Sequence, residues 1–283
     1  MKYPSNTDLE LLVSTNANQY LFHYTTYSSA LGILLSGQMR LGALANMNDP
    51  LEFQDCRDEG LVFVGSRSPE DCYSDLHDFD NAVIEKQNSV RLASFSMDLA
   101  DGNQNEFYNN LSKGWARSRM WAQYADNHKG VCLIFDKMNL VQSFENTFKE
   151  SETRYGVVKY TNDLEPLKCA LWRSCKSLLT QDKIEYLFQK CEDFRDEQEF
   201  RLLLVNKDLK NAEKIVSFSI SDSICGIIPG VRFPQENELS LKNARDFCNP
   251  NIKWLPIWWS YGMPRLSDPA RFKAMIEETM KTK

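Results

Sequence analysis

The sequence predicts an α+β protein, a single mixed domain over residues 1–283 whose central split or mixed β-sheet is flanked by helices. Runs with strand-like alternation and segments with apolar residues at helical spacing are interspersed along the chain. The 42% hydrophobic and 25% charged residues are ordinary for a globular protein, so a full core is expected. No repeat or obvious linker divides the chain, and one domain with insertions at about 56–88 and 164–193 is the simplest interpretation.

Short apolar or alternating runs mark the expected strands. These are 19–24, 39–44, 61–64, 90–97, 131–135, 154–160, 197–205, 215–220, 224–228 and 254–259. The run at 131–135 is apolar throughout and indicates a buried strand. At 90–97 the alternation places Ser94 and Ser96 on the face opposite Phe95.

Helical spacing, caps and glycine stops mark the expected helices. These are 8–12, 30–35, 81–89, 112–126, 164–193 and 269–282. The helix at 30–35 presents three leucines on one face, with Ser28 or Ser29 as its cap and Gly37 as its stop. Residues 65–80 are acidic and weakly patterned, which indicates a loop.

Charge and cysteine content narrow the classes of function. A net charge of −6 gives no global electrostatic argument for nucleic acid or an anionic membrane as partner. No window approaches about 18 apolar residues, so no membrane span is expected. No hydrophobic leader follows Met1, and the eight cysteines form no CxxC pair. These features favour reduced thiols in a cytoplasmic protein.

Several well-defined catalytic motifs are missing from the sequence. It has no P-loop, no GxGxxG, no HExxH and no GxSxG motif. The three histidines, His23, His77 and His128, are too far apart for metal-ligand spacing, so no metal is expected.

His23 and Thr25 are the first candidates for ligand binding. They lie at the end of the expected strand 19–24, on the face opposite Phe22 and Tyr24. One interpretation is a histidine whose hydrogen bonds are satisfied at a strand end. The other is an imidazole that contacts a ligand hydroxyl or phosphate with the help of Thr25.

A stripe of ring side chains runs along the expected helix 112–126. Helical spacing aligns Trp121, Tyr124 and His128. Such a stripe is more often core than ligand platform, which favours the core for Trp121. A phenol and an imidazole are nevertheless costly to bury without partners, so both interpretations stay open for Tyr124.

Charged side chains begin the expected strand 197–205. Alternation puts Glu197, Glu199 and Arg201 on one face. The two carboxylates raise each other's proton affinity, and the guanidinium lowers it again. A surface charge ladder is the alternative, but the apolar run that follows is typical of a central strand, which favours a functional role.

Four motifs together resemble a bacterial family of uncharacterised domains. The family's pattern is His-Tyr-Thr, Asn-Asp-Pro-x-Glu, Trp-x-x-Tyr-x-x-x-x-x-Gly and Glu-x-Glu-x-Arg. In this chain the motifs lie in the same order at 23–25, 48–52, 121–130 and 197–201. They span about 180 residues, and the last 80 or so contribute little to the resemblance.

The order of these motifs in turn resembles the His-Tyr-Glu branch of the ADP-ribosyltransferase superfamily. The resemblance implies an ADP-ribosyltransferase-like fold and NAD as substrate. By this resemblance, His23 would contact a ribose of NAD and Tyr124 would pack on the nicotinamide. Glu199 would hold the nicotinamide ribose. Thr25 would assist His23, and Glu197 would be the first acid of the Glu-x-Glu pair.

Two features depart from the superfamily pattern. Tyr124 is expected on a helix rather than at a strand end, and the glycine-bearing segment that accompanies the first motif is missing. Tyr24 is therefore a rival for the nicotinamide contact. The full set of expected NAD contacts besides the His-Tyr-Glu residues is Tyr24, Thr25, Ser94, Ser96, Trp121, Glu197 and Arg201.

The implied chemistry is cleavage of the nicotinamide–ribose bond. Positive charge develops on the sugar, as in glycoside hydrolysis, and a carboxylate such as Glu199 would stabilise it. The expected function is ADP-ribosyl transfer to a protein or nucleic acid by a bacterial toxin or anti-phage defence effector, with an antitoxin or immunity protein as partner. The alternatives are a non-enzymatic binding module with a buried His/Tyr/Glu network and a nucleotide glycosidase that uses the paired carboxylates.

Overall fold

The computed structural model of the 283-residue chain describes most of the expected sheet. The described residues are 19–47, 85, 88–99, 112–162, 187–206, 208–209, 214–260 and 262–266. The expected helices at 8–12 and 269–282, the strand at 61–64 and the motif at 48–52 lie outside them, as do most of the insertions at 56–88 and 164–193.

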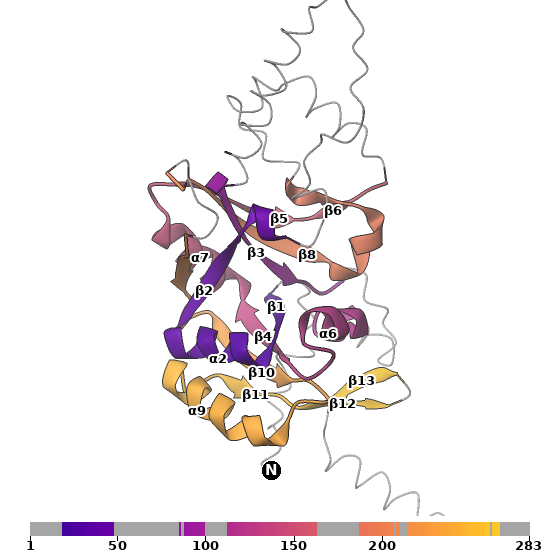
Figure 1. The fold of residues 1–283 in the computed structure, drawn as a ribbon. Coiled ribbons are helices and arrows are strands. Elements are labelled where there is room, and N and C mark those ends of the chain that lie inside the picture. The colour runs from indigo at the N-terminus through magenta and orange to yellow at the C-terminus, as the bar shows by residue number, and fades with distance from the viewer. Residues whose placement is uncertain are drawn as a thin grey trace, which may run out of the picture.

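In the part of the chain that the structure describes, a mixed nine-stranded β-sheet forms the centre of the fold (Figure 1). Its strands are β1 (Tyr20–Thr25), β2 (Gln38–Ala43), β3 (Val90–Ser96), β4 (Val131–Asp136), β5 (Glu152–Val157), β8 (Glu199–Val205), β9 (Val216–Ser219), β10 (Ile224–Pro229) and β11 (Lys253–Trp254). The main order is β11-β10-β4-β1-β3-β2-β9, with β8 beside β3 and β5 beside β8. The pairs are antiparallel except β10 with β11, which is parallel.

The sheet splits at β3. On one side, β8 pairs with β3 along its whole length. On the other side, β1 pairs at one end, where Phe22 lies opposite Ser96, and β2 pairs at the other end, where Gly42 lies opposite Leu92. The strands β1 and β2 therefore leave the same edge of β3 at different heights.

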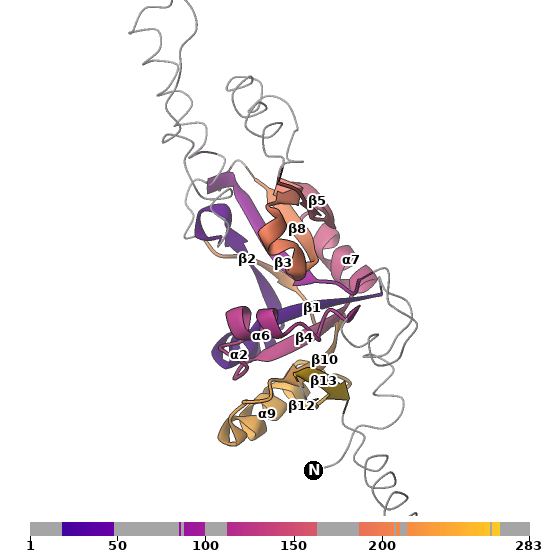
Figure 2. The ribbon, with the colours of Figure 1, turned by 90° about the vertical axis from the view of Figure 1, so that its right-hand side faces the viewer.

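Helices cover both faces of the sheet (Figure 2). They are α2 (Tyr27–Ser36), α6 (Ser118–Tyr124), α7 (Lys137–Thr147) and α9 (Glu238–Cys248). Alternation along β1 separates the two layers, because Leu21 packs in the core cluster of α2, α7 and α9, whereas Phe22 packs in the cluster of α6. The α+β class with a mixed sheet between helices is confirmed. No helix in the described ranges is long and apolar enough to cross a membrane.

The boundaries of α2 follow from its caps. Thr26 Oγ1 accepts a hydrogen bond from the backbone N–H of Ser29 at 3.2 Å, so the helix begins at Tyr27, three residues before the expected start. Gly37 ends it in the left-handed conformation, with φ 61°, as the sequence predicts.

The helix expected at 112–126 is shorter in the structure, because its first turn is held in another conformation. Asp98 accepts a hydrogen bond from the backbone N–H of Gly114 at 2.7 Å and forms an ion pair with Lys113 at 2.9 Å. An added Cβ at Gly114 would lie 2.4 Å from the ring of Phe22. These contacts fix a tight turn against β1, and the helix begins only at Ser118.

The expected strand 197–205 and helix 164–193 also need correction. Gln198 adopts a left-handed conformation, with φ 44°, which breaks the extended backbone so that β8 begins at Glu199. Glu197 instead ends the 3₁₀ helix η5 (Glu192–Glu197) and does not alternate with Glu199 along a strand. Residues 187–193 are not α-helical, because β7 (Gln189–Lys190) pairs with β6 (Lys159–Tyr160).

Pro256 interrupts the aromatic strand expected at 254–259. Proline has no N–H for a sheet ladder, so β11 stops at Trp254 and the chain continues in a separate hairpin. The hairpin consists of β12 (Ile257–Ser260) and β13 (Met263–Leu266). The helices α7 and α9 are additions that the sequence interpretation missed.

Candidate functional site

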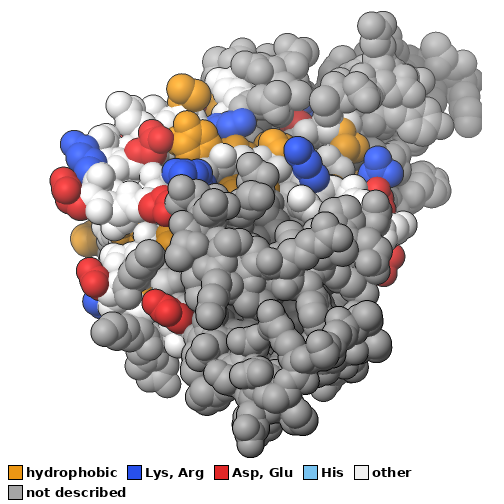
Figure 3. Space-filling view, turned by 90° about the horizontal axis from the view of Figure 1, so that it is seen from above, with side chains coloured by type: hydrophobic (Ala, Val, Ile, Leu, Met, Phe, Trp, Pro, Cys, Tyr) orange, Lys and Arg blue, Asp and Glu red, His pale blue; other side chains and the backbone are white. Residues whose placement is uncertain are grey.

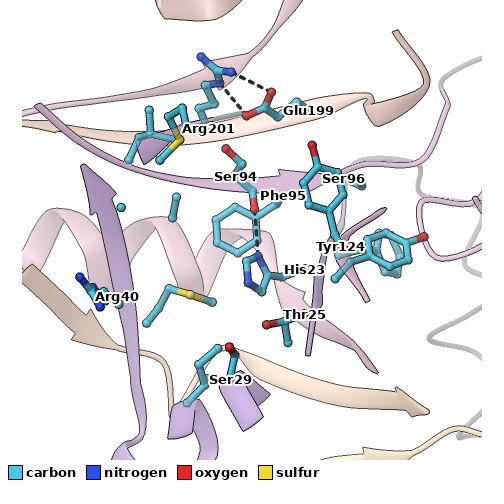
Figure 4. A pocket seen from close by; sticks show the side chains of 18 of the residues that line it. His23, Thr25, Ser29, Arg40, Ser94, Phe95, Ser96, Tyr124, Glu199 and Arg201 are labelled. Carbon is cyan, nitrogen blue, oxygen red and sulfur yellow. Dashed lines mark hydrogen bonds and ion pairs between the residues drawn. The ribbon is translucent and has the colours of Figure 1, made fainter. Parts of the chain in front are cut away.

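A pocket of about 700 Å³ opens where β1 and β2 diverge from β3 (Figure 4). This volume is in the range of sites for small molecules and cofactors. Most of the expected site residues line it: His23, Thr25, Ser94, Ser96, Tyr124, Glu197, Glu199 and Arg201. The split of the sheet thus brings together side chains from the first and last sequence motifs.

His23 stands at the centre of this pocket, where its ring is fixed by β3 (Figure 4). Its Nδ1 lies 3.0 Å from the carbonyl oxygen of Ser94, and the ring packs against Phe95 with centroids 5.6 Å apart. Because a carbonyl only accepts, Nδ1 must carry the proton and donate. Burial lowers the pKa of His23, and the bond to Ser94 offsets this only in part. The imidazole is therefore neutral at pH 7, which leaves Nε2 as a hydrogen-bond acceptor.

Glu199 is a buried, ionised carboxylate on the opposite side of Ser94. Its oxygens accept from Arg201 Nε at 2.6 Å and Nη2 at 3.0 Å, and Lys190 Nζ lies 3.0 Å from Oε2. Burial acts to raise the pKa of this carboxyl, but the charges of Arg201 and Lys190 and the hydrogen bonds from Arg201 and Ser94 outweigh it. The pKa is consequently held below its ordinary value.

Glu197 joins the same network from η5. Its Oε1 accepts from the Tyr124 hydroxyl at 2.6 Å, and its Oε2 accepts from Lys190 Nζ at 2.8 Å. The backbone N–H of Glu199 also donates to the hydroxyl of Tyr160 at 2.9 Å. The two acids therefore share one lysine, although only Glu199 lies on the strand.

Ser96 carries an unpaired hydroxyl on the pocket wall. The residue is 2% exposed, and its Oγ has no hydrogen-bond partner among the described residues. A buried hydroxyl without a partner is unfavourable, and a ligand that enters the pocket can supply the missing bond.

Trp121 and Tyr24 lie mainly in the core. The indole of Trp121 is fully buried and donates to the carbonyl of Trp115 at 2.8 Å. The ring of Tyr24 packs edge-on against Trp121, and its hydroxyl donates to the carbonyl of Gly114 at 2.6 Å. Tyr24 contributes to the pocket wall, whereas Tyr124 reaches the pocket with its phenol paired to Glu197.

His128 lies beyond the end of α6 and outside the pocket lining. Its backbone is left-handed, with φ 70°, but its ring still stacks on Trp121 with an interplanar angle of 11°. Of the expected ring stripe, the contact between Trp121 and His128 therefore exists without the continuous helix that its spacing suggested.

Three basic residues at or beside the pocket were not identified from the sequence. Lys190 falls in a segment expected to be helical, where its pairing with both acids could not be read. Arg117 donates to the carbonyl oxygens of Glu197 at 2.8 Å and Met97 at 2.5 Å, so it ties the acid-bearing turn to the end of β3. Arg40 lines the pocket from β2, where its exposed side chain lies between the buried Met39 and Leu41.

The described part of the chain has no cluster of metal-binding side chains. Among the described residues, no group of three or more histidine, cysteine or acidic side chains could hold a metal ion. The four described cysteines, at 132, 191, 225 and 248, are free thiols. On the face shown in Figure 3, the described surface mixes acidic, basic and hydrophobic side chains and has no continuous basic patch.

Comparison with known proteins finds a family model that is similar to one segment of the chain. Residues 120–202 match the model of a family described as a protein of unknown function, DUF2971. The segment contains the motifs at 121–130 and 197–201 but not His23, and it is less than half of the chain. The comparison with curated proteins gives no match. The chain is thus similar to an uncharacterised domain over this segment, and the family description assigns no activity.

Proposed function

We propose that the protein is an NAD-dependent ADP-ribosyltransferase whose reaction centre is the pocket at the split of the sheet. The observation that carries this proposal is the convergence of His23, Tyr124 and Glu199 on one pocket, although they are far apart in the sequence. These are the residue types that the superfamily uses, in the same order along the chain.

The protonation states support the proposed reaction. Neutral His23 can accept a hydrogen bond at Nε2 from a ribose hydroxyl, because its Nδ1 already donates to Ser94. Ionised Glu199 can stabilise the positive charge that develops on the nicotinamide ribose as the C–N bond breaks. Nicotinamide leaves with the electron pair of that bond, and an acceptor atom then bonds to the ribose carbon and loses its proton.

The pocket wall supports NAD as the substrate. The unpaired Ser96 hydroxyl can bind a polar group of the ligand, and the ring of Tyr124 offers a flat surface to nicotinamide. Its hydroxyl is anchored on Glu197, so the ring orientation is fixed before the substrate binds.

Release of nicotinamide from NAD by the purified protein tests the proposal. Glu199→Gln should lower the rate at least about 100-fold, since it removes charge stabilisation in the transition state. Glu236→Gln is the matched control, because Glu236 is exposed on a different segment, and it should release nicotinamide at the wild-type rate. An equal rate in Glu199→Gln and wild type would exclude Glu199 as the carboxylate that stabilises the transition state.

The acceptor is proposed to be a protein or nucleic acid in the cytoplasm, as expected for a toxin or defence effector. Mass spectrometry of the products after incubation with NAD and candidate acceptors identifies it. ADP-ribose attached to an acceptor supports transfer, whereas free ADP-ribose alone indicates a nucleotide glycosidase.

A second candidate function is a binding module without catalysis. It is favoured by the complete pairing of the acids, since Arg201, Lys190 and Tyr124 already occupy the carboxylate oxygens of Glu199 and Glu197. In that case Glu199→Gln would lower the melting temperature, and calorimetry would detect no binding of NAD to the wild-type protein.

A further inference from the structure

The pocket has a second half, between α2 and β2, that the proposed catalytic residues do not use. It is lined by Ser29, Gly32 and Ser36 from α2, by Arg40 from β2 and by Ser217 from β9. Figure 4 shows Ser29 on the far side of His23 from Glu199, and Arg40 to the left of His23. A ligand held by His23 can therefore extend into this half.

The charges of the pocket leave one cation uncompensated. Among the described lining residues, the carboxylates of Glu197 and Glu199 are matched by the cations of Lys190 and Arg201. The guanidinium of Arg40 makes no hydrogen bond or ion pair with the described part of the chain. Since His23 is neutral, the described lining carries one net positive charge and favours an anionic ligand.

A second arginine near Arg40 strengthens the preference of this half of the pocket for an anionic ligand. The positive charge of Arg40, in addition to burial, lowers the pKa of the guanidinium of Arg91. Two like charges are therefore close enough to repel each other. An anion at Arg40 would relieve this repulsion and form charge-assisted hydrogen bonds with the guanidinium.

Gly32 adds a second observation about this half of the pocket, which is the open space beside α2. It lies in the middle of α2, where glycine is unfavourable because of its backbone entropy. An added Cβ would meet no atom within 4 Å, so the packing of the protein does not require glycine here. The residue lines the pocket, and the missing side chain leaves a flat patch of helix on which a ligand can lie.

We propose that this half of the pocket binds the phosphate of a nucleotide, with Arg40 as the anion contact and the helix surface at Gly32 as the support for the adjoining neutral part. This inference deepens the proposed function and rests on it for the choice of NAD, whose diphosphate would lie between Arg40 and the ribose near His23.

Calorimetry with ADP and adenosine tests the anion contact without requiring catalysis. The wild-type protein should bind ADP at least about tenfold more tightly than adenosine, and Arg40→Gln should abolish that difference. Arg154→Gln is the matched control, because Arg154 is exposed on β5 and outside the pocket, and it should keep the difference. Equal affinities of Arg40→Gln and wild type for ADP would overturn the proposal.

Bulky substitution tests the role of Gly32. Gly32→Leu should retain a cooperative unfolding transition, since the space around residue 32 is open, but should weaken ADP binding about tenfold or more. Ser28→Leu places the same side chain on α2 outside the pocket lining and should bind ADP as the wild type does. Unchanged ADP affinity in folded Gly32→Leu would contradict the proposed ligand position.

The phosphate site at Arg40 and the transferase activity can fail independently of each other in these experiments. Nicotinamide release with an unchanged KM for NAD in Arg40→Gln would overturn the phosphate site and leave the transferase intact. ADP binding that depends on Arg40, without nicotinamide release from NAD, would support the phosphate site and contradict the transferase.

Discussion

At the scale of single residues, the pocket holds a neutral imidazole, that of His23, close to an ionised carboxylate, that of Glu199. Ser94 separates His23 from Glu199, since its carbonyl accepts from the imidazole and its hydroxyl hydrogen-bonds to the carboxylate. Burial disfavours charge on both groups, but only Glu199 has neighbouring cations to compensate. A neutral imidazole and an ionised carboxylate therefore face the same pocket at neutral pH.

The lowered pKa of Glu199 predicts a specific loss of stability in acid. In the unfolded chain a glutamate has a pKa of about 4.3, so below that value the unfolded state binds the proton more readily than the folded state. The contribution of Glu199 is complete above about pH 5 and is lost as the pH falls through the folded pKa. Urea unfolding at a series of pH values should show a shallower acid loss in Glu199→Gln than in wild type. Identical slopes would contradict the assigned ionisation.

The lowered pKa of His23 predicts that its imidazole titrates below about pH 6.5. NMR titration of the histidine ring protons measures this midpoint, and the missing signal in His23→Gln assigns it. Because the neutral form accepts the ribose hydroxyl in the proposed reaction, the rate should fall on the acid side only below about pH 6.5. A midpoint at or above that value would contradict the burial argument.

At the scale of elements, α2 shows how its two glycines serve different purposes. Gly37 has a φ of 61° and ends the helix, and an added Cβ would lie 2.9 Å from Ser221 Oγ. Gly32 has ordinary helical surroundings and open space beside it. The first glycine is required by the backbone, whereas the second is not required by the fold.

Alanine at the two positions should therefore act in opposite directions. Gly32→Ala should raise the free energy of unfolding by about 0.5–1 kcal/mol, because alanine is the better helix former. Gly37→Ala should lower it by about 1 kcal/mol or more, because alanine is strained in the left-handed region. Urea unfolding of both variants against wild type gives the two values. A loss of stability in Gly32→Ala would show that the fold does require glycine at that position.

Arg117 connects three elements, and its removal should loosen the acid-bearing turn. It extends from the start of α6 to the carbonyls of Met97, after β3, and Glu197, at the end of η5. Arg117→Met should lower the free energy of unfolding by about 1–3 kcal/mol, because both carbonyls lose a charged donor. Arg119→Met is the control, since Arg119 is exposed and should cost less than about 1 kcal/mol. Equal effects of the two variants in urea unfolding would show that the bridge contributes nothing specific.

At the scale of the whole molecule, the sequence predicts the strands and the convergence of motifs better than it predicts the turns. The apolar run of β4 and the run at 202–205 in β8 are visible without tertiary information. The start of β8 depends instead on the left-handed Gln198, which the periodicity does not reveal. Lys190 forms ion pairs with Glu197 and Glu199. The sequence pattern places Glu197 on a strand, whereas in the structure it ends a 3₁₀ helix. Ion pairs between residues that are brought together only by the fold cannot be predicted from the local spacing of the sequence.

A crystal structure of Glu199→Gln bound to NAD would show where the substrate lies in the pocket. We expect the nicotinamide ribose between His23 Nε2 and residue 199, the nicotinamide ring at Tyr124 and the diphosphate towards Arg40. An empty pocket at saturating NAD, or NAD bound at another surface, would contradict the proposed function.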